Sequence, residues 1–144
     1  FLYHNNLRSL PAGIFDRNKD LMKVHLGYNN LETLPTGIFD RNENLLQILL
    51  NNNHLTTLPV GMLKNSKLLN GIDLRNNQLI TLPAGLFDEN EKLNIIVLES
   101  NQLALLPDGI FHNLKALSAL YLSNNRLSSL PAEVFDNNTE LQYL

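Results

Sequence analysis

The prolines of this chain recur at one fixed interval. Each of the six lies 24 residues after the one before, and no other proline occurs: Pro11, Pro35, Pro59, Pro83, Pro107 and Pro131. A period of roughly 20 to 50 residues that runs through a whole sequence is typical of solenoids, in which each repeat packs against its neighbours. The period therefore predicts one array over residues 1–144, made of six 24-residue repeats and the start of a seventh.

Leucines and an asparagine keep the same register. Leucine columns, with one residue per repeat, begin at Leu2, Leu7 and Leu21, and a mixed aliphatic column begins at Val24. The asparagine column consists of Asn5, Asn29, Asn53, Asn77, Asn101 and Asn125. Together the columns give the pattern LxxLxLxxNxL, the signature of leucine-rich repeats. On this pattern the chain resembles the leucine-rich repeat family, which implies a curved solenoid.

Each column has a physical reason. Ile72 and Leu74 lie two residues apart and place both side chains on one face of a short strand, so Gly71, Asp73 and Arg75 point to the other face. Strands this short bury their leucines only by stacking in parallel, about 4.8 Å apart. The asparagine follows where the chain leaves the strand. Its carboxamide can donate to and accept from backbone groups that the turn leaves unpaired.

The second half of each repeat reads LPxGxF, in which proline and glycine lie too close together for a regular helix. We expect turns and extended chain there, with five phenylalanines stacked beneath and Leu63 in their place in the third repeat. The glycine suits a positive φ, and we expect the sixth repeat, which has Glu133 instead, to turn differently. The expected fold class is an α/β-type solenoid with little helix. It is a horseshoe with a parallel sheet of six strands on its concave face and turns and irregular chain on its convex face.

The outward strand positions are the candidates for a binding surface. The repeat leaves them free, and they combine aromatic, apolar and charged residues as protein interfaces do. The candidate ligand-binding residues are Phe1, Tyr3, His25, Tyr28, Leu49, Asp73, Arg75, Val97, Glu99 and Tyr121. Asp73, Arg75 and Glu99 should lie close together, with Arg75 and Glu99 in one column on strands about 5 Å apart, and we expect a surface salt bridge there rather than a catalytic acid–base pair. The alternative is that these residues only cover the sheet or contact an adjacent part of a longer protein.

Motifs and composition argue against catalysis. No HExxH spacing, phosphate-binding glycine loop or GxSxG elbow occurs, and there are no cysteines. His4 and His25 invite a metal site near Tyr3 and Tyr28, but an exposed aromatic surface is favoured there. We therefore expect no enzyme activity, no cofactor and no metal.

Charge and hydropathy limit the classes of partner that the chain can have. The net charge of -3 is too weak and too mixed to indicate nucleic acid or an anionic membrane surface. No apolar run approaches the roughly 20 residues that span a bilayer, so we expect no direct membrane contact in this segment.

One signal concerns modification. Asn137-Asn138-Thr139 is the only Asn-x-Ser/Thr sequon, and it follows Phe135 on the expected convex side. Glycosylation at Asn137 would leave the concave face open to a partner. Neither end of the chain has a polar capping repeat, so we also expect an uncapped fragment of a longer ectodomain.

The 24-residue LPxGxF repeats resemble those of extracellular proteins. GIFDRNKDLMKVHL (13–26) and GIFDRNENLLQILL (37–50) resemble the ectodomain of insect Toll receptors. Three places after the phenylalanine position, where variable lymphocyte receptors tend to have leucine, only Leu114 follows that pattern, and four repeats have Asn18, Asn42, Ser66 and Asn90. The resemblance implies a single-pass plasma-membrane receptor of immunity or development. Its ectodomain would bind a Spätzle-like cystine-knot cytokine or a receptor partner chain and signal through an intracellular TIR domain.

Two other interpretations stay open. One is a secreted immune or adhesion protein, such as a variable lymphocyte receptor, that uses the same repeats to bind a protein without signalling. The other is a spacer that sets the reach of neighbouring repeats.

Overall fold

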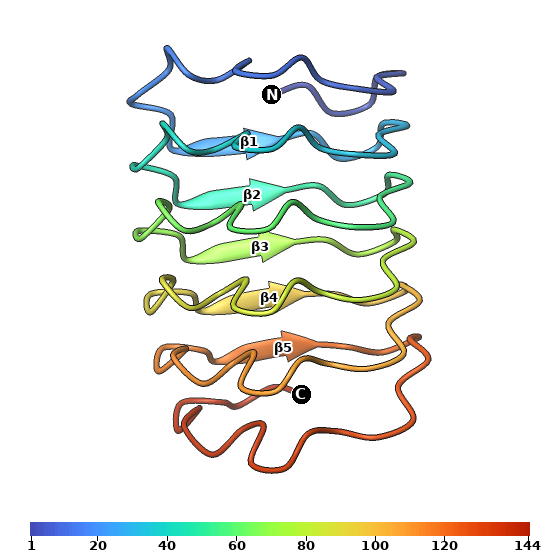
Figure 1. Ribbon diagram of the computed structural model, residues 1–144, viewed down its shortest axis with the longest axis vertical. Coiled ribbons are helices and arrows are strands. Elements are labelled where there is room, and N and C mark those ends of the chain that lie inside the picture. The colour runs from blue at the N-terminus through green and yellow to red at the C-terminus, as the bar shows by residue number, and fades with distance from the viewer.

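Five short strands and no helix make up the regular structure of the computed structural model, which describes all 144 residues. The strands are β1 (Lys23–His25), β2 (Gln47–Leu49), β3 (Gly71–Asp73), β4 (Ile95–Val97) and β5 (Ala119–Tyr121). They form one parallel sheet in sequence order (Figure 1). Val24 pairs with Ile48, and Ile48 pairs with Ile72, so the register of the sheet equals the repeat length.

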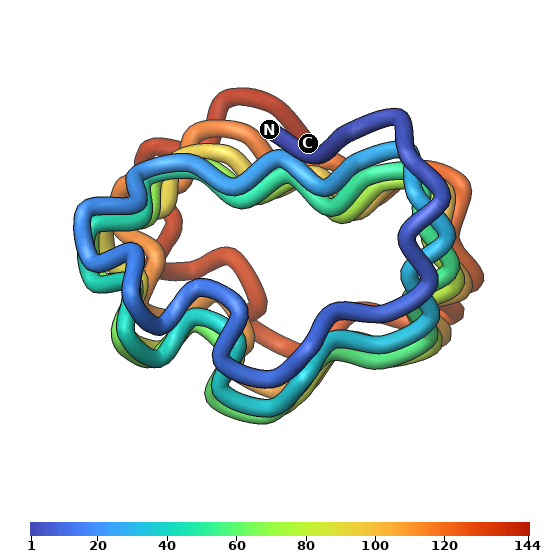
Figure 2. The backbone as a smooth tube through the Cα atoms, turned by 90° about the horizontal axis from the view of Figure 1, so that it is seen from above, coloured from blue at the N-terminus to red at the C-terminus, as the bar shows by residue number.

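The coils stack into a solenoid. Seen from above, successive coils superimpose as one closed outline, and both chain ends lie on the same long side of it (Figure 2). This is the side of the sheet, because the Leu2 backbone N–H donates to His25 O of β1 at 2.8 Å. The predicted solenoid with a parallel sheet along one side is confirmed. Turns and irregular chain alone complete each coil.

The prediction of six strands was wrong by one. The backbone near both ends does bond to the sheet: Leu2 N–H donates to His25 O, and Leu120 N–H donates to Tyr143 O at 2.9 Å. Tyr143 also forms an isolated parallel bridge with Ala119. In the 24-residue register of the sheet, the strand after β5 would occupy positions 143–145 and the strand before β1 would end at Phe1, so the 144 residues include only part of each.

Apolar columns fill the inside of the coils. One cluster of 32 buried residues runs through the stack, and Leu50, Leu74 and Leu98 are fully buried in it. Burial of a leucine side chain contributes about 1.5–3 kcal/mol, so the repeated columns account for most of the driving force. The core needs no helix because strands and turns already close every coil.

The phenylalanines stack as expected, in two runs. Ring centroids lie 6.0 Å apart for Phe15 and Phe39, 6.3 Å for Phe87 and Phe111, and 6.1 Å for Phe111 and Phe135. The fully buried Leu63 occupies this position in the third repeat and divides the two runs.

The turn that follows each proline is the same in all six repeats. The five glycines of the motif have φ between 66° and 71°, and Glu133 adopts φ 57°. Asp136 N–H donates to Glu133 O at 3.2 Å, as Asp40 N–H donates to Gly37 O at 3.0 Å. The expectation that the sixth repeat turns differently was therefore wrong. The backbone bond sets the turn, and the glutamate accepts a left-handed conformation that costs a residue other than glycine about 1–2 kcal/mol.

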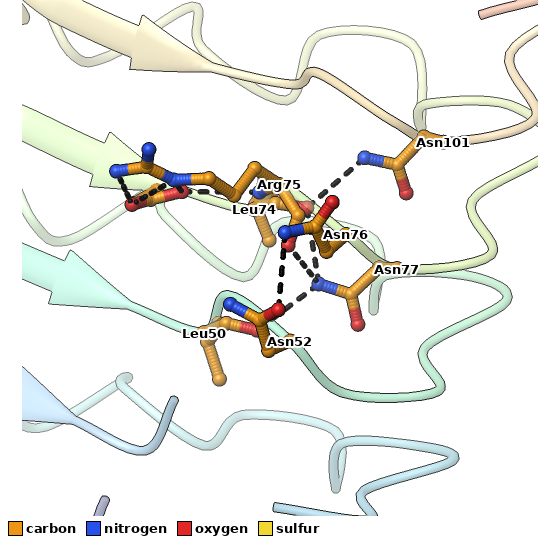
Figure 3. Close-up of polar contacts among 8 residues, drawn as sticks. Leu50, Asn52, Leu74, Arg75, Asn76, Asn77 and Asn101 are labelled. Atoms are coloured by element: carbon orange, nitrogen blue, oxygen red, sulfur yellow. Dashed lines mark hydrogen bonds and ion pairs between the residues drawn. The ribbon is translucent and has the colours of Figure 1, made fainter. Parts of the chain in front are cut away.

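The asparagines that end the strands pair backbone groups within and between coils. Asn77 Nδ2 donates to Leu74 O in its own repeat and to Leu50 O in the preceding one, both at 3.0 Å (Figure 3). Its Oδ1 accepts from Leu55 N–H at 3.1 Å. Asn101 repeats the arrangement one coil further on and donates to Leu74 O at 3.0 Å. We call this column the first asparagine ladder.

A second asparagine ladder occupies the column three residues after the phenylalanine position. The sequence marks this column only as a point of resemblance to a family. Asn90 Nδ2 donates to Leu63 O at 3.1 Å and to Ser66 O at 2.9 Å. Asn42 and Asn138 make the equivalent pair of bonds. All three amides are buried, and their Oδ1 atoms have no hydrogen-bond partner. The second ladder therefore donates without accepting.

Candidate protein-binding face

The first two coils present five rings in mutual contact, which we call the aromatic cluster: Phe1, Tyr3, His4, His25 and Tyr28. Tyr3 stacks on His25 with ring centroids 4.5 Å apart, and His4 stacks on Tyr28 at 4.2 Å. Edge contacts join Phe1 to His25 at 5.9 Å and Tyr3 to His4 at 5.4 Å. Tyr3 and Tyr28 are each 47% exposed. The rings thus hold one another in place while leaving surface open to solvent.

The backbone beneath two of these rings is left-handed. His4 and Tyr28 both have φ 55°, and the equivalent residues of the later coils share the conformation: Asn52, Asn76, Ser100 and Asn124. Asparagine tolerates this region better than tyrosine or histidine. It also gains a contact, since Asn76 Nδ2 donates to Asn52 Oδ1 at 3.0 Å (Figure 3). Sequence reasoning placed His4 in an exposed aromatic surface but left it out of the candidate binding residues, although its departure from an asparagine and serine column was a signal.

An ion pair lies at the charged centre of the face. Arg75 bonds to Asp73 of its own repeat, with Nη2 at 2.7 Å from Oδ2 and Nε at 3.1 Å from Oδ1 (Figure 3). No ion pair joins Arg75 to Glu99, which instead accepts a hydrogen bond from Ser123 Oγ at 2.7 Å. The expected surface salt bridge therefore forms between Arg75 and Asp73 and does not include Glu99, because Asp73 offers both carboxylate oxygens to the guanidinium. The hydrogen bond to Asp73 raises the pKa of Arg75.

The apolar part of the face is more covered than expected. Val97 is 9% exposed and Asp73 is 7% exposed, although both point outward from the sheet. Side chains on parallel strands about 4.8 Å apart screen their neighbours, so direction alone does not give access to solvent. Leu49 is half-buried, and Tyr121 keeps 39% of its surface open.

The electrostatics of the aromatic cluster oppose protonation of its central histidine. Desolvation by burial lowers the pKa of His25, and the nearby charge of Lys23 lowers it further. Lys23 Nζ also lies 5.9 Å from the centroid of the Phe1 ring. At neutral pH the His25 ring is therefore an uncharged stacking surface.

The other predicted positions lie off this face. The Asn5 side chain bonds within its own repeat, where Nδ2 donates to Leu2 O and Tyr3 O. Asn137 lies beside His112 on the turn side, and its Nδ2 is 3.2 Å from His112 O. No group of three or more histidine, aspartate or glutamate side chains is placed to hold a metal ion. No helix is present that is long and apolar enough to span a bilayer.

The family is decided by the match to the leucine rich repeat model, which covers residues 1–55, 43–103 and 91–144. The chain belongs to the leucine-rich repeat family. A search of curated proteins found no match.

Solved leucine-rich repeat structures share the fold. The leucine-rich repeat domain of APL1 is 26% identical over 92% of this chain, with a TM-score of 0.86. A leucine-rich repeat protein of Leptospira interrogans is 32% identical over 97% of the chain, also with a TM-score of 0.86. TLR13, in its complex with ssRNA13, is 24% identical over 96% of the chain with a TM-score of 0.87, and supports the fold alone. This leucine-rich repeat chain spans only 35%, 34% and 20% of these three structures.

Proposed function

We propose that this leucine-rich repeat chain is a ligand-binding part of a Toll-like receptor ectodomain, and that it binds a protein through its sheet face. The sheet face is the outward side of β1 to β5 together with the aromatic cluster. The cluster is the observation that carries the proposal. Exposed aromatic anchors dominate protein interfaces, and rings already held by one another lose little entropy when a partner binds.

Backbone strain supports the same site. His4 and Tyr28 occupy a left-handed position that the later repeats fill with asparagine or serine. Every coil adopts this conformation, so the unusual feature is the choice of a ring that suits it poorly, and residues in unfavourable backbone conformations cluster at functional sites. Retention of two rings at this position therefore favours a role in binding.

Charge favours a protein over a nucleic acid as the ligand. Phosphate recognition requires several unpaired lysine or arginine side chains on one surface. On the sheet face Arg75 is committed to Asp73, and the whole chain carries a net charge of -3. By resemblance to insect Toll receptors, the proposed ligand is a Spätzle-like cystine-knot cytokine outside the cell.

Tyr28→Asn separates binding from folding. The new amide suits the left-handed backbone and lies within reach of Asn52, which offsets the lost stack on His4, so stability should stay within about 1 kcal/mol of the original. We expect the affinity for a purified Spätzle-like cytokine, measured by surface plasmon resonance on the immobilised chain, to fall at least tenfold.

Val60→Asn is the matched control, because it removes an apolar side chain that is 82% exposed on the turn side. It should bind the cytokine as the original does. A folded Tyr28→Asn chain with unchanged affinity would contradict the proposal.

A secreted protein without signalling is the second candidate. The LRIM1/APL1C complex, 25% identical over 90% of the chain with a TM-score of 0.83, pairs two different proteins and favours a partner chain as the ligand. The chain spans 24% of that structure. An antibody raised against this chain distinguishes the two candidates. Full-length product in cell membranes would support the receptor, and full-length product in the medium would support the secreted protein.

Glycosylation at Asn137 is part of the same extracellular proposal. The sequon lies on the turn side beside His112, and a glycan there leaves the sheet face free. Secretion from animal cells should give a product that an endoglycosidase shortens, and Thr139→Ala should abolish the shift. A secreted product of unmodified mass would count against it.

A further inference from the structure

Gly71 leaves a hollow in the middle of the sheet face. In the same column β2 and β4 carry Gln47 and Ile95, whereas β3 has no side chain at that point. The hollow has a volume of about 170 Å³. A Cβ placed on Gly71 would meet only Gln47 Cγ, at 4.0 Å, so nothing in the chain fills the space.

The walls of the hollow are mainly apolar. Leu49, Ile95 and Val97 line it, with Gln47 and Asp73 as the polar contributors. Val97 is buried and Leu49 is half-buried. Ile95 is 43% exposed and forms the open side of the hollow, which is present without a partner. Preformed apolar depressions of this kind receive the anchor side chains of protein interfaces.

The charge of the hollow selects an uncharged occupant. Asp73 is the only ionisable residue in its lining, and Arg75 Nε and Nη2 together with the Arg75 backbone N–H bond to that carboxylate. A cationic side chain would have to displace Arg75 from a pair at 2.7 Å. An anionic side chain would face the Asp73 carboxylate. Only a neutral side chain enters without breaking a bond or burying an unpaired charge.

The size of the hollow also fits one residue. An apolar cavity of about 150 Å³ accepts a benzene molecule, so about 170 Å³ accepts a phenyl ring or a branched aliphatic group. We propose that this hollow is a socket for one uncharged apolar side chain, aliphatic or aromatic, that projects from a protein bound to the sheet face. The proposal rests on the proposed function, and it adds a specificity element in the centre of the sheet to the aromatic cluster at one end.

Side-chain analogues test the socket without a protein partner. The probes are N-acetyl-leucine amide and N-acetyl-phenylalanine amide, with N-acetyl-lysine amide for comparison, added to the chain with ¹³C-labelled methyl groups. The leucine and phenylalanine probes should shift the methyl resonances of Leu49, Ile95 and Val97 in a saturable way. The lysine probe should bind at least tenfold more weakly.

Gly71→Val fills the socket and should weaken the apolar probes at least tenfold without lowering the melting temperature, since the added side chain meets open space. Thr56→Val is the control, because it also introduces a valine, beside a depression that no hydrophobic residue lines. Equal binding of the lysine probe, or unchanged affinity in Gly71→Val, would overturn the socket.

The two proposals fail separately. If the unmodified chain does not bind the cytokine but the probes still shift the methyl resonances, the result counts only against the proposed function. If the probes bind the original chain but not Gly71→Val, and Gly71→Val still binds the cytokine as tightly, the hollow does not receive a side chain of the bound protein and the socket proposal is overturned.

Discussion

The two asparagine ladders differ in what each amide accepts. In the first ladder Asn77 Oδ1 is the acceptor for Leu55 N–H. In the second ladder Asn90 Oδ1 has no partner, and the carbonyl of Leu63 that Asn90 bonds also accepts from a backbone N–H, that of Ser66, at 3.0 Å. Removing a first-ladder amide therefore leaves a buried donor unpaired, whereas removing a second-ladder amide leaves none.

Asn77→Leu and Asn90→Leu measure this difference. We expect Asn77→Leu to lower the free energy of unfolding by about 1–3 kcal/mol, because the Leu55 N–H loses its only partner. Asn90→Leu should lower the free energy of unfolding by less than half of that amount, because it leaves no buried donor unpaired. A leucine also fits this position, as the fully buried Leu114 shows one repeat later. Urea unfolding of both variants gives the two values, and equal losses would contradict the distinction.

His25 predicts a pH dependence of stability. Its pKa is lowered in the folded chain, so the unfolded chain binds a proton more readily as the pH falls below the ordinary value near 6.5. The stabilisation from neutral His25 is fully present above that value and is lost as the pH falls through the window below it. We expect His25→Gln to flatten the fall in melting temperature between pH 7.5 and pH 5.5. Identical slopes for the two chains would contradict the assignment.

At the scale of elements, the strands were predictable because one period fixes both register and order. Each strand has only three residues, yet pairing of Val24 with Ile48 follows from the 24-residue spacing without further information. The partner of Arg75 was not predictable from columns, since its choice of Asp73 over Glu99 depends on side-chain reach within one repeat. The second ladder was visible as a column, but its burial and its bonds to the preceding coil appear only in the structure.

The aromatic cluster was predictable only in part. Tyr3, His25 and Tyr28 follow from their outward or near-strand positions, and the structure adds His4 through its stack on Tyr28. The burial of Val97 needed three dimensions, because screening by neighbouring strands leaves no mark on the sequence pattern. Leu49 and Tyr121 are therefore better test positions than Val97 for binding that is separable from stability.

At the scale of the whole molecule, each coil contacts only its neighbours, so one repeat can be removed in register. Deleting residues 49–72 joins Ile48 to Asp73 and preserves the 24-residue period. We expect a folded chain with a lower melting temperature by circular dichroism, because one coil of buried leucines is lost. Cytokine binding should fall at least tenfold, whereas a chain that serves only as a spacer would retain it.

The location of the interface tests the central claim most directly. Hydrogen–deuterium exchange of the chain with and without a purified Spätzle-like cytokine reports which backbone amides the partner covers. Protection should concentrate in residues 1–4 and 23–28 and at β2 to β4, with no change across the turns at residues 135–139. Protection confined to those turns, with the sheet face unchanged, would contradict the assignment of the sheet face as the binding surface.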